Sequence, residues 1–148
     1  MTSTRRSVTI PFSDVSVGDP LPDLRIEITA TLIVSGAISS RDFEGVHLDR
    51  DWAQRQGSKD IFMNILASNG LVGRYVTDWA GPDSLLKSVD IRLGAPNYPG
   101  DTMVLAGRVI ARQTTDSGGI VDVEVIGRNG LGDHVTAVVR VQLPEASR

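Results

Sequence analysis

The stretch DIFMNILASNGLVGRYVTDWAG, residues 60–81, carries apolar side chains around most of a helical wheel. At helical spacing it has Phe62, Ile65, Leu66, Val72, Val76 and Trp79, and on other faces Met63, Leu71 and Tyr75. A helix that is apolar on nearly all sides is usually buried. The pattern therefore predicts one long buried helix, with Asp60 as its N-cap and Gly81 and Pro82 at its end.

Alternating apolar and polar residues on both sides of this segment have the period of two that is typical of half-buried strands. The alternation covers the ranges 24–32, 89–93, 102–112, 121–125 and 135–143. Turn residues separate the later ranges at 95–101, 115–119 and 128–133. Because these three connections are short, we expect the last four strands to be antiparallel neighbours.

The remaining segments are polar and irregular. Residues 11–23 are rich in Pro, Gly and Asp and predict a loop, and 35–60 predict irregular chain with one short helix around 50–56. The sequence thus predicts an α+β fold in which one antiparallel sheet wraps around one buried helix. We expect a single domain over 1–148, with 1–10 as a mobile arm.

Composition excludes several classes of function. The net charge of −3 disfavours binding to nucleic acids or membrane surfaces through charge, and the chain has no cysteine for a disulfide or thiolate zinc site. No apolar run approaches the roughly 20 residues that a membrane span requires, and the N-terminus lacks the features of a secretory signal. We therefore expect a soluble, cytoplasmic protein.

The segment SSRDFEGVHLD, residues 39–49, holds the best candidates for chemistry. Asp42 and His47 lie five positions apart and are a candidate general base and general acid, since histidine is readily poised near neutral pH. A solvated polar loop is the alternative. The second histidine, His134, is expected to be a partly exposed strand residue. No metal site is expected, because the two histidines lie 87 positions apart in the sequence.

Several separated stretches resemble one family, the MaoC-like (R)-specific enoyl-CoA hydratases. RDFEGVHLD resembles the family motif G-D-x-N-P-[IL]-H-x-D, with Asp42 on its aspartate and His47 on its histidine. IRLGAPNYPGDTM (91–103) resembles the motif R-F-x-x-P-V-x-x-G-D-x-[LM], and VGDPLPDL and NGLGDHVTAVVRVQLP resemble its opening loop and last strand. The likeness covers residues 16 to 144 and is closest to the small subunits of actinobacterial steroid side-chain hydratases.

The resemblance implies a hotdog fold and the hydration of a trans-2-enoyl-CoA, with a steroid side chain as the acyl group, to the 3-hydroxyacyl-CoA. In this family Asp42 would accept a proton from water, and His47 would hold the water and deliver a proton to Cα. The backbone N–H of Ile65 would hold the thioester oxygen. Coenzyme A is part of the substrate, so no cofactor is expected.

The resemblance also implies an oligomer, either with a second MaoC-like chain of different sequence or as a homodimer. Four basic residues are candidates for the coenzyme A phosphates, and the sequence does not choose among Arg74, Lys87, Arg92 and Arg128. Two alternatives to hydration remain, an acyl-CoA thioesterase on the same fold and a non-catalytic partner subunit. Two departures stand out, Arg41 in place of the motif glycine and Glu44–Gly45 in place of Asn-Pro.

Overall fold

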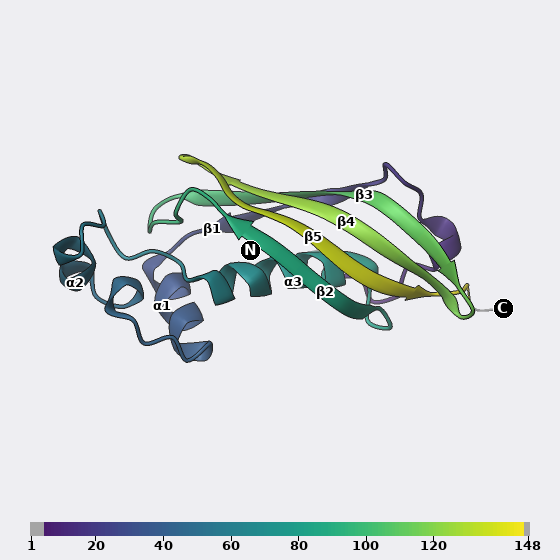
Figure 1. The fold of residues 1–148 in the computed structure, drawn as a ribbon, viewed down its shortest axis with the longest axis horizontal. Helices are drawn as coiled ribbons and strands as arrows, with labels where there is room; N and C mark the ends of the chain where they lie inside the picture. Colours follow the sequence, from purple (N-terminus) through teal and green to yellow (C-terminus); the bar gives the residue numbers. More distant parts are fainter. Residues whose placement is uncertain (1–4, 147–148) are drawn as a thin grey trace.

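The computed structural model describes residues 5–146 (Figure 1). Its helices and strands are β1 (Pro20–Glu27), α1 (Ala30–Ser39), α2 (Arg50–Arg55), α3 (Ile65–Ala80), β2 (Leu85–Leu93), β3 (Thr102–Thr115), β4 (Gly118–Asn129) and β5 (Gly132–Pro144). Two short 3-10 turns, η1 (Phe12–Asp14) and η2 (Gly45–His47), complete the elements. None of the described helices combines the length and apolar character needed to cross a membrane.

The five strands form one antiparallel sheet in the order β1-β3-β4-β5-β2. The expectation that the last four strands are sequential neighbours is wrong at β2, which pairs with β5 and forms the far edge of the sheet. The connection from β2 to β3 crosses the end of the β4–β5 hairpin, where Gly94 and Ala95 donate to the carbonyls of His134 and Asp133. Gly100, with φ of +93°, and the Asp101 side chain, which accepts from Thr102 N–H, shape the turn into β3.

The sheet curves over α3, which lies along its concave side (Figure 1). The buried face of this helix contributes Val72, Tyr75, Val76, Trp79 and Ala80 to the core. The strands supply inward side chains at alternate positions, among them Leu105, Val109, Val121, Val123, Val125, Val139 and Val141. Since each fully buried aliphatic side chain contributes about 1.5–3 kcal/mol, packing of the sheet against α3 strongly stabilises the fold. The predicted hotdog arrangement is confirmed.

The long helix is shorter at its start than the sequence predicts. Its N-cap is Asn64, whose side-chain oxygen accepts from the N–H of Ala67, and not Asp60. Asp60 instead accepts from Ile61 N–H and from Arg50. The helix ends as predicted at Gly81, which has φ of +102°.

The predicted strand over 24–32 is wrong after Glu27, because a second helix begins there. The hydroxyl of Thr29 accepts from the N–H of Leu32 and caps α1. Ile33 and Ala37, one helical turn apart, are fully buried. Apolar residues at 28, 30 and 32 satisfy a strand period locally, but the burial of α1 follows the helical period. The short helix predicted around 50–56 is confirmed as α2.

The described segment 6–10 lies beside the end of α3. The N–H groups of Arg6 and Ile10 donate to the carbonyls of Asp78 and Ala80. Residues 1–4 of the expected mobile arm lie outside the described residues.

Candidate active site

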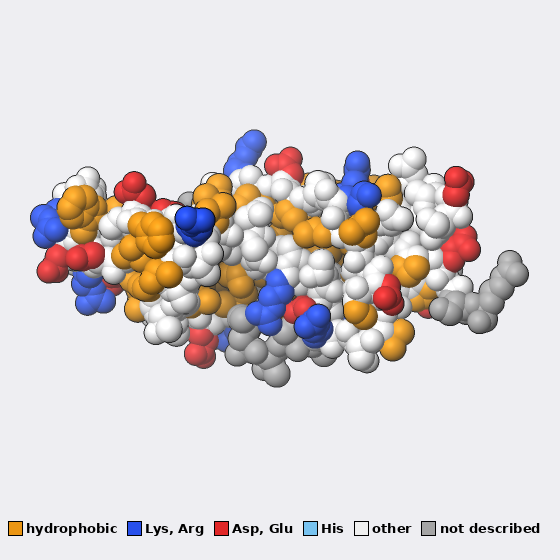
Figure 2. All heavy atoms as spheres, turned by 90° about the horizontal axis from the view of Figure 1, so that it is seen from below, with side chains coloured by type: hydrophobic (Ala, Val, Ile, Leu, Met, Phe, Trp, Pro, Cys, Tyr) orange, Lys and Arg blue, Asp and Glu red, His pale blue; other side chains and the backbone are white. Residues whose placement is uncertain are grey.

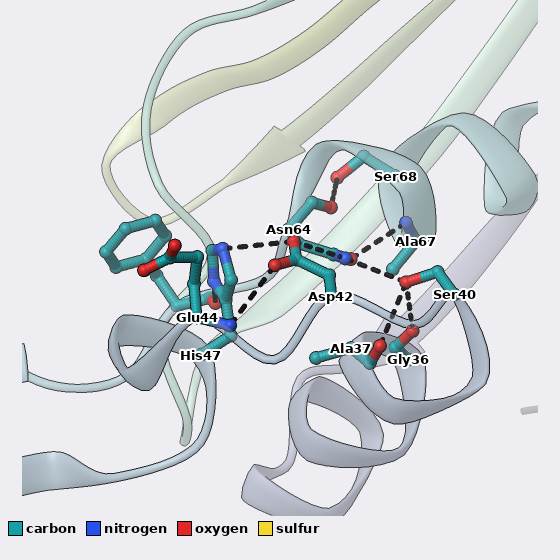
Figure 3. A network of polar contacts seen from close by, with 10 residues as sticks. Gly36, Ala37, Ser40, Asp42, Glu44, His47, Asn64, Ala67 and Ser68 are labelled. Atoms are coloured by element: carbon teal, nitrogen blue, oxygen red, sulfur yellow. Dashed lines mark hydrogen bonds and ion pairs between the residues drawn. The ribbon is translucent and has the colours of Figure 1, made fainter.

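Asp42 and His47 meet at the end of the molecule that carries α1, α2 and the start of α3 (Figure 3). Oδ2 of Asp42 lies 3.5 Å from Nε2 of His47. On the other side of the ring, Nδ1 is 2.6 Å from the carbonyl oxygen of Phe62. Because a carbonyl only accepts, Nδ1 carries the ring proton in the neutral form. The lone pair of Nε2 therefore faces the carboxylate region and is available to a water molecule.

The local chain explains why the histidine is fixed. His47 ends the 3-10 turn η2, and its N–H donates to the carbonyl of Glu44. The segment 62–64 lies against this turn, with Phe62 N–H donating to Val46. The phenyl ring of Phe62 meets the imidazole edge-on at 4.9 Å between centroids. The His47 side chain is only 10% exposed, whereas that of Asp42 is 22% exposed, so solvent reaches the dyad from the aspartate side.

Asn64 is part of the same network, although no motif in the sequence marks it as a site residue. Its Nδ2 donates to Oδ2 of Asp42 at 3.0 Å and to the hydroxyl of Ser40 at 2.9 Å. This amide is the main cause that lowers the pKa of Asp42, while burial acts in the opposite direction. The N–H of Glu44 and the charge of His47 lower that pKa further. The only signal in the sequence was a good N-cap residue before an apolar helix.

Arg41 keeps the backbone conformation that a glycine would adopt. Its φ is +58°, and it is the only non-glycine residue with positive φ among residues 5–146. Its N–H donates to the carbonyl of Ile38, and the next N–H, of Asp42, donates to Ala37. The left-handed residue therefore turns the chain sharply at the end of α1 and directs Asp42 toward Asn64. Arg41 thus adopts a positive φ, the backbone conformation that favours the glycine of the motif.

Gly45 occupies the motif position of proline for a steric reason. A Cβ at this position would lie 2.6 Å from Cγ of Trp52 in α2. The indole of Trp52 thus lies where the side chain of residue 45 would be. Glycine at this position leaves room for the Trp52 indole, and Asp49, the N-cap of α2, accepts from Trp52 N–H at 2.9 Å.

Ile65, the candidate oxyanion donor, is the first residue of α3. The first N–H groups of a helix have no partner within the helix, and the helix dipole is positive at this end. The Asn64 side chain takes the N–H of Ala67. Ile65 and Leu66 are half exposed, at 52% and 51%. The structure thus places this amide directly after the residue that contacts Asp42.

The prediction that His134 is partly exposed is wrong, since it is 2% exposed. The pairing of β4 with β5 shifts between Gly127 and Arg128, whose partners are Val135 and Asp133. His134 is the extra residue of this bulge and turns inward. Its Nδ1 donates to Ala95 O at 2.6 Å, and its Nε2 lies 2.7 Å from the hydroxyl of Ser68.

The Ser68–His134 pair joins α3 to β5 and is not open to substrate. Ser68 is fully buried, and burial lowers the pKa of His134. With Nδ1 protonated, Nε2 accepts a hydrogen bond from the Ser68 hydroxyl. The pair therefore acts as a structural cross-link inside the core.

The four candidate phosphate ligands come from three elements. Arg74 on α3 pairs with Asp78, and Arg128 at the end of β4 pairs with Asp133. Lys87 and Arg92 lie exposed on the edge strand β2. Within residues 5–146, no group of three or more His, Asp or Glu side chains is arranged to hold a metal ion.

Apolar side chains gather on the surface at the end of the molecule that carries α1, α2 and the start of α3 (Figure 2). From α1, the following loop and α3, the exposed large apolar residues are Ile38, Phe43, Ile65 and Leu66. The edge strand β2 carries further exposed leucines, Leu85 and Leu86 at its start and Leu93 at its end.

Comparison with known proteins identifies the family. No family model matches the sequence. The chain is 52% identical over 130 residues to the 3-oxo-4,17-pregnadiene-20-carboxyl-CoA hydratase beta subunit of Mycobacterium tuberculosis, covering 88% of this chain and 98% of that protein. Among solved structures, it matches a chain of the ChsH1–ChsH2 complex from M. tuberculosis at 53% identity and a TM-score of 0.81, covering 86% of this chain and 98% of that chain.

A more distant structure agrees in fold. The MaoC-like dehydratase from Rhodospirillum rubrum has a TM-score of 0.79 at 18% identity, covering 94% of this chain and 99% of that chain. The high identity to the beta subunit and the shared architecture lead to one conclusion. The chain belongs to the MaoC-like enoyl-CoA hydratase family, in the branch that includes the mycobacterial beta subunit.

Proposed function

We propose that this chain is the catalytic subunit of a hydratase that adds water to a trans-2-enoyl-CoA with a steroid side chain, giving the 3-hydroxyacyl-CoA. Two facts support the substrate class and the reaction: the 52% identity to a subunit named for hydration of a pregnadiene carboxyl-CoA, and the presence of the dyad in this chain. The observation that carries the proposal is the placement of Asp42 Oδ2 3.5 Å from Nε2 of His47, which has its other nitrogen tied to a carbonyl.

The chemistry follows from the protonation states. The oxygen of water forms a bond to Cβ while one of its protons leaves, and a proton is added to Cα, so no oxidant or reductant is required. Asp42 is ionised at neutral pH and accepts the proton of the attacking water. Nε2 of His47 holds the water and, once protonated, delivers a proton to Cα. The two groups exchange protons as a coupled pair.

The negative charge that develops on the thioester oxygen needs fixed donors. The backbone N–H of Ile65, at the N-terminus of α3, supplies one in this proposal. A backbone N–H does not depend on the side chain, so isoleucine at this position retains the donor.

The proposal includes a partner, a second MaoC-like chain of different sequence. The matched mycobacterial chain was crystallised in a complex of two named components, ChsH1 and ChsH2. The apolar surface of Ile38, Phe43, Ile65 and Leu66 beside the dyad would then line a substrate channel shared with the partner.

Hydration by the purified protein, expressed with and without its candidate partner, tests the proposal. Loss of enoyl absorbance would be measured with short, long and steroid enoyl-CoA substrates. Asp42→Ala and His47→Ala should each reduce kcat/KM by about 10²–10⁴-fold while circular dichroism and oligomer size stay unchanged. Full activity in both variants would indicate a non-catalytic partner subunit. Release of free coenzyme A thiol with no hydration of the enoyl double bond would indicate a thioesterase.

A further inference from the structure

We propose that Asn64 is a positioning residue for the reaction, because its side-chain amide holds the Asp42 carboxylate opposite Nε2 of His47 and ties it to the first turn of α3. The role in hydration rests on the proposed function of Asp42. The placement of the carboxylate does not depend on that function, and the two are tested separately below.

The orientation of the Asn64 amide is determined by its partners. The N–H of Ala67 is a donor only, so the Asn64 atom 2.9 Å from it must be the oxygen. Nδ2 therefore points the other way, where its two hydrogens are directed at Ser40 and Asp42. At 2% exposure Asn64 has no room to exchange these partners for water.

Ser40 fixes the second hydrogen of that amide. Its hydroxyl donates to the carbonyl of Gly36 at 2.7 Å, so its oxygen is free to accept from Nδ2 of Asn64. Gly36 also allows α1 to approach α3, since a Cβ at this position would lie 3.0 Å from Cβ of Ala67. The close contact of the two helices thus keeps Ser40 within reach of Asn64 (Figure 3).

The amide acts on one oxygen of the carboxylate. It donates to Oδ2 of Asp42, the same atom that lies 3.5 Å from His47, while Oδ1 receives the N–H of Glu44 at 3.3 Å. A donor at Oδ2 favours the ionised form and fixes the plane of the carboxylate. Position 44, which is asparagine in the motif, is Glu44 in this chain, and the side-chain amide that contacts Asp42 is that of Asn64, the N-cap of α3.

Three substitutions separate this role from helix capping. Asn64→Ser and Asn64→Asp both keep a side-chain oxygen that caps α3, but neither can donate to Asp42 as the amide does. Asn64→Ala loses both functions. Asn69→Ser, in the next turn of α3, is the matched control for the change of residue type.

The readouts are the titration of the Asp42 carboxyl followed by ¹³C NMR, assigned with Asp42→Asn, and the steady-state kinetics with the candidate partner present. In Asn64→Ser and Asn64→Asp we expect the pKa of Asp42 to rise and kcat to fall by about 10–100-fold, with KM changed less than threefold, since small misplacements of a reacting group can cost 10²-fold. We expect the thermal midpoint to fall more in Asn64→Ala than in Asn64→Ser.

An unchanged Asp42 titration in Asn64→Ser would overturn the proposal, because Asn64→Asp adds a negative charge that by itself raises this pKa. Reduced kcat with an unchanged titration and a lowered thermal midpoint would do the same, because it would indicate a capping role alone. If the titration shifts but Asp42→Asn keeps full hydratase activity, the placement holds and the proposed function of Asp42 fails.

Discussion

Nδ1 of His47 lies 2.6 Å from the carbonyl oxygen of Phe62, so this ring nitrogen is committed to a structural hydrogen bond. Only Nε2 is left to exchange protons at the site. His47→Asn retains a donor near the position of Nδ1 and has no counterpart of Nε2, whereas His47→Ala removes both.

We expect these two variants to differ in stability and not in activity. Both should lose about 10²–10⁴-fold in kcat/KM, because both lack Nε2. His47→Ala leaves the carbonyl of Phe62 without its donor and should be less stable than His47→Asn by about 1–3 kcal/mol. Urea denaturation and the hydration assay measure the two effects, and substantial activity in His47→Asn would contradict the assignment of Nε2.

A second prediction concerns the contact between Gly45 and Trp52. Because a Cβ at residue 45 would overlap the indole ring, Gly45→Ala should destabilise the protein by about 1–3 kcal/mol. The same substitution in a Trp52→Ala background should cost much less, since the ring is gone. The coupling energy of this double-mutant cycle measures the contact directly. Equal costs of Gly45→Ala in the two backgrounds would show that the ring moves aside freely.

A third prediction follows from the positive φ of Arg41, +58°. A β-branched residue is strongly disfavoured in this left-handed conformation, so Arg41→Val should destabilise the protein by about 1–2 kcal/mol and reduce activity by displacing Asp42. Arg41→Gly should stay within about 1 kcal/mol of the parent protein, because the gain in backbone freedom in the unfolded state offsets the relief of strain. Denaturation curves that rank valine with glycine would argue against the strained turn.

The sequence predicted those features that depend on local periodicity or on a motif. The core of α3 and its end at Gly81 follow from the residues themselves, and Asp42 and His47 stood out through the motif. Asn64 was not predicted as part of the site. Its contact with Asp42 joins residues 22 positions apart, and no local pattern encodes such a contact.

Two other errors have the same origin. Strands β3, β4 and β5 pair in chain order, so one side of β5 stays open, and β2 pairs there as the edge strand. This position depends on the whole sheet and not on the residues of β2 alone. His134 is buried because the register shifts by one residue near Arg128, and a one-residue shift reverses the face of a side chain.

The buried His134 makes the final prediction, a pH dependence of stability. Burial lowers its pKa in the folded protein, so the unfolded chain binds a proton first as the pH falls. Its contribution to stability is fully present above the unfolded pKa of about 6.5 and is lost progressively below it. His134→Asn can keep a donor to Ala95 O but has no imidazole to titrate. Chemical denaturation at pH 8 and pH 5.5 should therefore show a smaller loss of unfolding free energy in this variant than in the parent protein. The chain has two histidines, so His47→Asn is the matched control. A pH dependence that persists in His134→Asn and disappears in His47→Asn would assign the effect to His47 and contradict the prediction.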